Sequence, residues 1–563
     1  MNRHPVFALS ESLVDQYAAL RPMNATMMGV AGHDHRWDDL SPAGVAAYAA
    51  EVERWEAQLD ALPPAVDRWD ALAVAVCRDW VALERDALAH ADHRVDLNNI
   101  ASPFQTIRMV FDQMSTATPE GWEAIAARLF GLPEALAGYR ASLSEGLSRG
   151  ELVAARQVRA CVEQGRVAAS KDGPFGAIEA QLASSEVPDE LAARVREGVR
   201  VACAAYGELT DWLNDTYLPR APEREGVGRA RYLRAARRFV GAEIQPEETH
   251  AWGWSEVRRL QGEILRLGDE ICGARTLPEL YAHLRSDPAF ASENRETFLE
   301  TMRARQARAM ADLDGSHFDI PAAIRHVDVK VAPPGGPLGA YYVPPSEDLS
   351  RPGSIWYSLS GEGPFPLYDE VTTAYHEGFP GHHLQCGLQV YLREKLCRVH
   401  RLAYGYSGYA EGWALYAEQL MDELGYFESP AYRVGMLAMQ LVRACRVAFD
   451  VGAHLGFAIP DDAPFAPGEA WTFERGVEFF QSFGGLAEDH AVSEVTRYLG
   501  WPGQAISYKV GQREMLALRD AWIAAGRGPL KEFHHRVLDV GNVSLDMLRE
   551  LVLGPDARPT ATA

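Results

Sequence analysis

Long apolar runs and paired cysteines are scarce in this 563-residue sequence. No apolar run approaches the ~20 residues that span a bilayer, and residues 1–20 lack the basic start and apolar core of a signal peptide. The seven cysteines are scattered, odd in number and without a Cys-x-x-Cys pair. This pattern favours reduced thiols and argues against a disulfide framework or a thiolate zinc site. We therefore expect a cytoplasmic protein that has no membrane partner.

Positive charge is also in short supply. The chain carries 55 basic and 78 acidic residues, which gives a net charge of −23. Such a protein repels phosphate backbones, so we expect no nucleic-acid partner. A hydrophobic content of 47% is ordinary for a globular protein, and 563 residues exceed the usual size of one core. The length fits two lobes around a cleft. The sequence does not determine the oligomeric state, and a homodimer is one of the possibilities.

The most informative stretch is His-Glu-Gly-Phe-Pro-Gly-His-His at residues 376–383. In the zinc hydrolase motif His-Glu-x-x-His, two imidazoles lie one helical turn apart and the Glu acts as general base. Here four residues, a Pro-Gly pair among them, separate the Glu from the next histidine. Because proline breaks helical hydrogen bonding, a two-residue bulge would return His382 to the position of the second ligand. On an unbroken helix His383 would share a face with His376, but the Pro-Gly pair makes us prefer His382.

A second carboxylate-bearing segment, Glu-Gly-Trp-Ala-Leu-Tyr-Ala-Glu, covers residues 411–418 and starts 29 residues after His382. Glu411 or Glu418 could be the third ligand, because seven residues return to nearly the same helix face. We prefer Glu411, which opens the helix beside a loop-like run. A helix end with partly buried imidazoles would explain the His-Glu pair alone, but not the second segment. The sequence therefore predicts one Zn²⁺ held by His376, His382 and Glu411.

Four blocks in the C-terminal half carry a resemblance to a known family, over about 170 residues in order. They are His-Glu-x-x-Pro-Gly-His-His-x-Gln (376–385), Glu-Gly-Trp-Ala-Leu-Tyr-x-Glu (411–418), Arg-Tyr-Leu-Gly-Trp-Pro-Gly-Gln-Ala-Ile-Ser-Tyr-Lys-Val-Gly (497–511) and Phe-His-His-Arg-Val-Leu-Asp-Val-Gly-Asn (533–542). The sequence resembles the bacterial family labelled domain of unknown function 885. This resemblance implies a mainly α, two-lobed metallopeptidase-like fold, similar to Taq carboxypeptidase, thimet oligopeptidase and angiotensin-converting enzyme. It implies no particular substrate.

Helical patterns fill the first part of the chain. One helix begins at Thr118-Pro119, a capping hydroxyl followed by proline, and Gly131-Leu132-Pro133 is expected to end it. The character of the sequence changes after residue 320. We therefore expect a helical N-terminal lobe (1–320) and a catalytic lobe (321–563) that together form one continuous structural unit.

Three short β-like runs precede the His-rich motif, at residues 327–331, 340–343 and 355–360. A Pro-Gly-rich run separates the first two. We expect a small β-sheet next to the metal-site helix. In peptidases of this type an edge strand holds an extended substrate by backbone hydrogen bonds, and a structural hairpin is an equally good interpretation.

The expected chemistry uses Glu377 as general base beside a zinc ion that keeps one position for water. Related helical peptidases place a tyrosine hydroxyl from a C-terminal segment at the oxyanion, so the resemblance makes Tyr508 the first candidate for that role. Weaker candidates for contact with the substrate or the oxyanion are His383, Arg497, Tyr498, Gln504 and Lys509. The carboxylates that could orient the ligand imidazoles are Asp369, Glu370 and Glu418.

Three classes of function are compatible with this pattern. The leading one is a zinc-dependent peptidase that cleaves short peptides, because a helical two-lobed fold buries its metal in a narrow channel. The second is a zinc hydrolase of a non-peptide amide in natural-product metabolism. The third is a non-catalytic binding protein on the same fold, but such a protein needs no general base, and Glu377 is present. We expect a small peptide or amide as the substrate.

Overall fold

The computed structural model describes residues 3–333 and 339–554 of the chain. Helices make up 66% and strands 4% of it, which confirms the expected mainly α fold with small sheets. Within the described residues, no helix is both long enough and apolar enough to span a bilayer.

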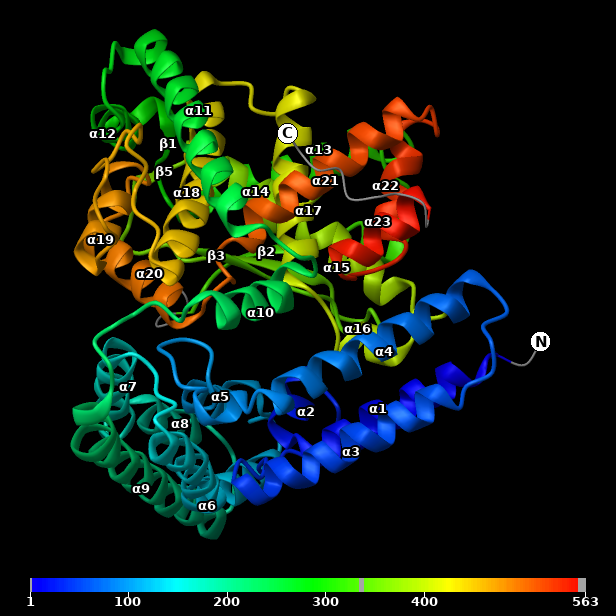
Figure 1. The fold of residues 1–563 in the computed structure, drawn as a ribbon, viewed down its shortest axis with the longest axis vertical. Coiled ribbons are helices and arrows are strands. Elements are labelled where there is room, and N and C mark those ends of the chain that lie inside the picture. Colours follow the sequence, from blue (N-terminus) through cyan, green and yellow to red (C-terminus); the bar gives the residue numbers. More distant parts are fainter. Residues whose placement is uncertain (1–2, 334–338, 555–563) are drawn as a thin grey trace. The chain divides into compact units, whose positions relative to one another are not determined.

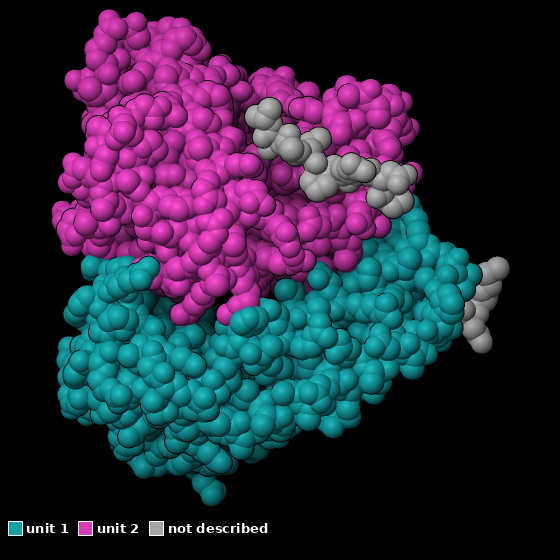
Figure 2. Space-filling view, viewed as in Figure 1, with its two compact units in different colours: residues 1–225, 397–403 teal, residues 226–396, 404–563 magenta. Residues whose placement is uncertain are grey.

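The chain divides into two compact units, coloured separately in Figure 2. Unit 1 consists of residues 1–225 and 397–403, and unit 2 of residues 226–396 and 404–563. The boundary between compact units therefore falls near residue 225. The change of character after residue 320 lies inside unit 2, where a series of helices gives way to strands.

Unit 1 is a helical unit with its own core (Figure 1). Buried apolar side chains between residues 97 and 217 form most of that core, for example Trp122, Leu129 and Tyr206. The helices of unit 1 are α1 (Pro5–Leu20), α2 (Pro22–Met28), α3 (Pro42–Asp60), α4 (Arg68–Ala89), α5 (Pro103–Met109), α6 (Pro119–Arg149), α7 (Ala155–Ala168), α8 (Pro174–Leu182), α9 (Asp189–Trp212) and α16 (Arg398–Leu402).

Helix α6 starts as expected but does not end where the sequence suggests. The Thr118 side chain caps its first turn by accepting from the backbone N–H of Gly121. The expected end at Gly131-Leu132-Pro133 is wrong, because α6 continues through Pro133 to Arg149. Proline inside a helix costs about 3 kcal/mol. The buried stripe of α6 continues on both sides of the proline and packs along α9, and this packing outweighs the lost hydrogen bond.

Unit 2 is built around long helices that pack in pairs. Helix α11 packs along α18, and α17 packs along α21 (Figure 1). Helix α14 contacts both α17 and α18, so the His-rich motif faces the segment that carries Glu411 and Glu418. The helices of unit 2 are α10 (Arg229–Val240), α11 (Pro246–Cys272), α12 (Leu277–Ser286), α13 (Arg295–Leu313), α14 (Glu370–Glu377), α15 (His382–Tyr391), α17 (Ser407–Glu423), α18 (Pro430–Leu455), α19 (Phe473–Ser482), α20 (Glu488–Gly500), α21 (Ser507–Ala524), α22 (Leu530–Leu538) and α23 (Leu545–Leu553).

A small three-stranded sheet lies next to the motif helices. Strand β4 (Gly353–Tyr357) is central, pairing in parallel with β2 (Val327–Val331) and in antiparallel with β3 (Ala340–Val343). Strand β3 contacts α14 and β4 contacts α15, as expected for a sheet beside the metal-site helix. The third strand ends at Tyr357, so the expected run to residue 360 is too long. Most of the Pro-Gly-rich run before β3 lies outside the described residues. A second, two-stranded sheet pairs β1 (Ala291–Ser292) with β5 (Phe365–Pro366).

Candidate metal centre

The backbone breaks at the point that the Pro-Gly pair predicts. Helix α14 ends at Glu377 and α15 begins at His382. The chain turns so tightly that a Cβ atom on Gly381 would lie 2.0 Å from the carbonyl oxygen of His376. The buried amide of Gln306 on α13 satisfies backbone groups around the break. Its Nε2 donates to the carbonyl oxygen of Ala374 at 2.7 Å, and its Oε1 accepts from the backbone N–H of Phe379 at 2.7 Å.

The break brings His376 and His382 together beside Glu411. The Nε2 atoms of His376 and His382 lie 3.3 Å and 3.5 Å from Oε2 of Glu411. The two imidazole rings meet edge to face, with their centres 4.9 Å apart. One ligand atom from each of the three residues lies within 4.8 Å of the other two. The structure thus groups the three residues that the sequence predicts as ligands.

The donor atoms of this triad fit a zinc ion. Oε2 of Glu411 is buried and makes no hydrogen bond within the described residues, so it faces the two imidazoles as an unused acceptor. A tetrahedral zinc with bonds of 2.0–2.1 Å holds its ligand atoms about 3.3–3.4 Å apart, close to the 3.3 Å and 3.5 Å that separate the two imidazole nitrogens from Glu411. Burial opposes the charge on Glu411, but the two imidazoles outweigh it and keep the pKa of this carboxyl low. An ionised oxygen and two imidazole nitrogens are the donors of a catalytic zinc site.

Glu418 orients the first imidazole from behind. Its Oε1 lies 2.7 Å from Nδ1 of His376, and its Oε2 accepts from the Thr372 hydroxyl at 2.9 Å. Because Nδ1 faces this fully buried carboxylate, Nε2 of His376 is the atom turned toward Glu411. Of the two carboxylates left open by the spacing, Glu411 is therefore the one grouped with both imidazoles, and Glu418 lies behind His376. The other two carboxylates proposed for this orienting role, Asp369 and Glu370, make no hydrogen bond or ion pair with either imidazole within the described residues.

Glu377 follows the first ligand directly in sequence and is half-buried. Its carboxylate makes no hydrogen bond within the described part of the chain, so it remains able to take up a proton. Burial raises the pKa of Glu377, and the repulsion of Glu411 adds to it, against the lowering effect of His376 and His382. A carboxylate whose pKa is raised toward neutrality is suited to general acid–base work.

Tyr508 stands near the start of α21, within reach of the charges of the triad. Burial and the charge of Glu411 both raise the pKa of this phenol. Its ring lies 4.8 Å from the guanidinium carbon of Arg446, and its hydroxyl makes no hydrogen bond within the described residues. By contrast, the Tyr498 hydroxyl accepts from Nε of Arg446 at 2.7 Å and donates to Glu494. Tyr508 is therefore the tyrosine whose hydroxyl is available to another group.

One sequence family matches nearly the whole chain. Its profile, described as "Bacterial protein of unknown function (DUF885)", matches residues 22–552. The chain belongs to this family. No curated protein matches the sequence.

Two solved structures share the fold of this DUF885 protein. A candidate lipoprotein from Colwellia psychrerythraea superposes with a TM-score of 0.84 at 24% identity, over 97% of this chain and 98% of that chain. A candidate lipoprotein of unknown function from Shewanella oneidensis superposes with a TM-score of 0.76 at 17% identity, over 97% and 99%. At these identities the likeness shows the fold alone.

Two of the expected substrate contacts of this DUF885 protein are not brought to the triad. Both ring nitrogens of His383 are used elsewhere: Nδ1 lies 3.0 Å from the Tyr342 hydroxyl and Nε2 lies 2.9 Å from the carbonyl oxygen of Ile324. Nζ of Lys509 is buried and is held by two glutamine side chains at 2.8 and 3.0 Å and by Glu256 at 3.1 Å. These two residues support the packing around the triad and do not face it.

The arginines of α18 were not identified from the sequence. Arg443 lies 3.6 Å from Glu418, and Arg446 pairs with Glu494 at 3.0 Å. Gln440 on the same helix also reaches Glu418, with 3.4 Å between Nε2 and Oε2. The signal was present, because three polar side chains at intervals of three residues interrupt the otherwise apolar stretch 434–449 of this helix.

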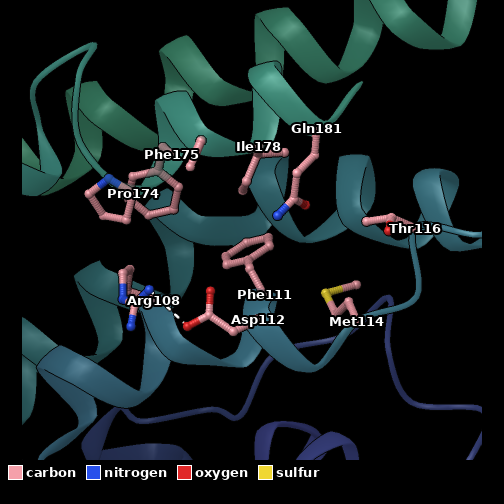
Figure 3. Close-up of a pocket in the computed structure, with 10 residues that line it drawn as sticks. Arg108, Phe111, Asp112, Met114, Thr116, Pro174, Phe175, Ile178 and Gln181 are labelled. Carbon is pink, nitrogen blue, oxygen red and sulfur yellow. Dashed lines mark ion pairs between the residues drawn. The ribbon is translucent and has the colours of Figure 1, made fainter. Parts of the chain in front are cut away.

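A pocket in unit 1 is a separate feature of this DUF885 protein. It has a volume of about 150 Å³ and is lined by residues of and around α5 and α8. Figure 3 shows Phe111, Phe175 and Ile178 around it, with the Arg108–Asp112 ion pair of 2.9 Å at one side. Ligand pockets usually measure about 300–1,000 Å³, and none of the lining residues belongs to the candidate metal centre. We therefore take the triad in unit 2, and not this pocket, as the candidate functional site.

Proposed function

We propose that this protein is a zinc-dependent hydrolase, and that it is a peptidase acting on short peptides. The observation that carries the proposal is the convergence of His376, His382 and Glu411 with a general base, Glu377, directly beside the first of them. The buried, otherwise unused oxygen of Glu411 supports a metal between these residues.

Zinc, when bound, supplies a Lewis acid that polarises the scissile carbonyl and makes water easier to deprotonate. Glu377 takes the proton of the attacking water as the new C–O bond forms. It then delivers this proton to the leaving nitrogen as the C–N bond breaks, so that no proton is lost or gained overall. The free hydroxyl of Tyr508 donates to the oxyanion that develops on the carbonyl.

The same residues support a second candidate, hydrolysis of a non-peptide amide in natural-product metabolism, because peptide and amide bonds share this chemistry. We also propose that the protein is cytoplasmic, that its substrate is a small molecule and that it does not bind nucleic acid. The two structural neighbours described as candidate lipoproteins make a membrane-anchored form the alternative location, and cell fractionation distinguishes the two.

Zinc analysis of two neighbouring histidine variants tests the metal site. His382→Ala should lose the bound zinc, whereas His383→Ala, whose ring is held by Tyr342 and Ile324, should retain it. Loss of zinc from His383→Ala alone would overturn the ligand set.

Hydrolysis by a base-deficient variant tests the mechanism. Glu377→Gln should retain zinc and lose activity by several orders of magnitude on the best substrate from a screen of dipeptides, tripeptides and blocked peptides. The matched control is Glu423→Gln, the same change at an exposed glutamate of unit 2. Equal turnover by both variants would refute the hydrolase mechanism.

A further inference from the structure

One face of α18 leads away from the metal centre. Gln440, Arg443 and Arg446 follow one another at intervals of three residues, so they lie along the same side of the helix. The first two contact Glu418, the carboxylate behind His376. With a rise of about 1.5 Å per residue, Arg446 stands about 4.5 Å further along the helix than Arg443.

A second arginine near Arg446 is fully engaged. Helix α20, which packs against α18, carries Glu494 and Arg497. Arg497 donates hydrogen bonds to both carboxylate oxygens of Glu494, from Nε to Oε1 at 3.0 Å and from Nη2 to Oε2 at 2.8 Å. Its remaining terminal nitrogen, Nη1, donates to Gln504 at 3.2 Å. Arg497 and Glu494 therefore neutralise each other.

Arg446 retains a free donor and an unbalanced charge. Its Nη2 shares an oxygen of Glu494 at 3.0 Å, and its Nε donates to the Tyr498 hydroxyl at 2.7 Å. Its Nη1 has no hydrogen-bonding partner within the described residues and is not among their buried unsatisfied atoms. Two arginines thus face one glutamate and leave a net positive charge, in a chain whose total is −23.

Tyr508 connects this charge with the metal centre. Its ring lies 4.8 Å from the guanidinium carbon of Arg446. One turn earlier on the same helix, Arg443 lies 3.6 Å from Glu418, which contacts His376. A substrate that meets the triad and the Tyr508 hydroxyl therefore has Arg446 nearby. Guanidinium groups bind carboxylates through charge-assisted hydrogen bonds.

We propose that Arg446 binds the free carboxylate of the substrate, and that the substrates are peptides or N-acylated amino acids cleaved at the bond before their C-terminal residue. This inference rests on the proposed function and specifies its substrate class. A positive group in this position repels the ammonium of a free N-terminus and attracts a C-terminal carboxylate. The proposed mode of cleavage is thus carboxypeptidase-like.

Paired substrates test the inference. An N-blocked dipeptide is compared with its C-terminal amide, which has the same scissile bond and no carboxylate. Hydrogen bonds to charged groups contribute about 1.5–3 kcal/mol, so the zinc-loaded wild type should prefer the free acid by about 10- to 150-fold in kcat/KM. Arg446→Gln should remove that preference by lowering kcat/KM for the acid and leaving the amide within about twofold. Arg446→Lys, which keeps the charge, should restore part of it.

The control is Arg266→Gln, which removes the same charge from an exposed ion pair with Glu270 on α11. It should leave the preference unchanged. Equal cleavage of acid and amide by the wild type would overturn the inference while the proposed function stands. An equal loss on both substrates in Arg446→Gln would also overturn it, because Arg446 would then only position Tyr508. If zinc-loaded wild type cleaves neither substrate nor any peptide of the screen, the proposed function itself fails. If Arg446→Gln does not fold, the preference of the wild type for the acid over the amide, and its partial retention in Arg446→Lys, still test the inference.

Discussion

Replacing Glu418 by Gln should weaken zinc binding although Glu418 is not itself a ligand. The side chain is fully buried, and its two oxygens accept from His376 and from the hydroxyl of Thr372. Glutamine has the same shape but turns one of the two oxygens into an NH2 group. In one orientation the NH2 group would face the Thr372 hydroxyl and the Gln440 amide. In the other it would face the His376 ring. The variant also removes the negative charge beside Arg443.

The size of the effect follows from the role of Glu418 as the group that orients a ligand. Loss of such a partner costs about 10- to 100-fold in metal affinity, which corresponds to about 1.4–2.7 kcal/mol. A separate cost falls on folding, because breaking a buried pair leaves an uncompensated charge on Arg443 and destabilises by about 3–5 kcal/mol. Zinc affinity and stability should therefore both fall, and the activity of fully zinc-loaded protein should fall less.

Competition with a zinc chelator measures the affinity, and urea unfolding measures the stability. The control is Glu423→Gln on the same helix, since Glu423 is exposed, pairs with Arg519 at 2.8 Å and accepts from the Gln419 amide at 3.2 Å, away from the triad. Zinc affinity of Glu418→Gln within twofold of Glu423→Gln would refute the reasoning. An affinity loss without any loss of stability would show that Arg443 finds another partner.

Three further changes test other parts of the molecule. Tyr508→Phe should lower turnover by about 10²–10³-fold at unchanged zinc content, and a higher Michaelis constant at unchanged turnover would make Tyr508 a substrate-positioning residue instead. Arg128→Met should destabilise the protein by about 2–5 kcal/mol in urea unfolding, because this buried side chain donates to four acceptors in residues 22–36; a loss below 1 kcal/mol would contradict this. Burial raises the pKa of Asp450 to about 7, above its unfolded value of about 4, so its contribution to stability falls as the pH rises from about 4 to 7. Asp450→Asn keeps an acceptor for the Tyr232 hydroxyl but cannot ionise. The melting temperature of this variant should therefore exceed that of the wild type most at pH 8, and the difference should shrink toward pH 5. A difference that does not change with pH would contradict the raised pKa of Asp450.

Local rules predicted the grouping of the triad better than they predicted its surroundings. The break at Pro380 and the return of His382 to His376 follow from what proline does to one helical turn, and the structure has both. The orientation of His383 depends on the carbonyl of Ile324, 59 positions away in the chain. No local pattern contains such a contact. The substrate contact expected of His383 therefore stays a prediction, with both ring nitrogens engaged by Tyr342 and Ile324.

The same limit explains the errors in the fold. Gly131-Leu132-Pro133 is a helix end by local propensity, but α6 continues because its buried face packs on α9, far along the sequence. The boundary of the compact units near residue 225 is likewise a property of tertiary contacts, whereas the change near residue 320 reflects only a switch from helices to strands.

The buried polar groups behind the triad argue against the third function class, a non-catalytic binding protein. They form a continuous chain from His376 through Glu418 and Gln440 to Lys509 and Glu256, with separations of 2.7, 3.4, 3.0 and 3.1 Å. Buried ionic networks are often less stable than apolar residues of the same volume. A scaffold would gain stability by replacing this chain with leucine and methionine. The proposed function gives the network a use, because an imidazole that ligates a metal must be held in one tautomer and one orientation.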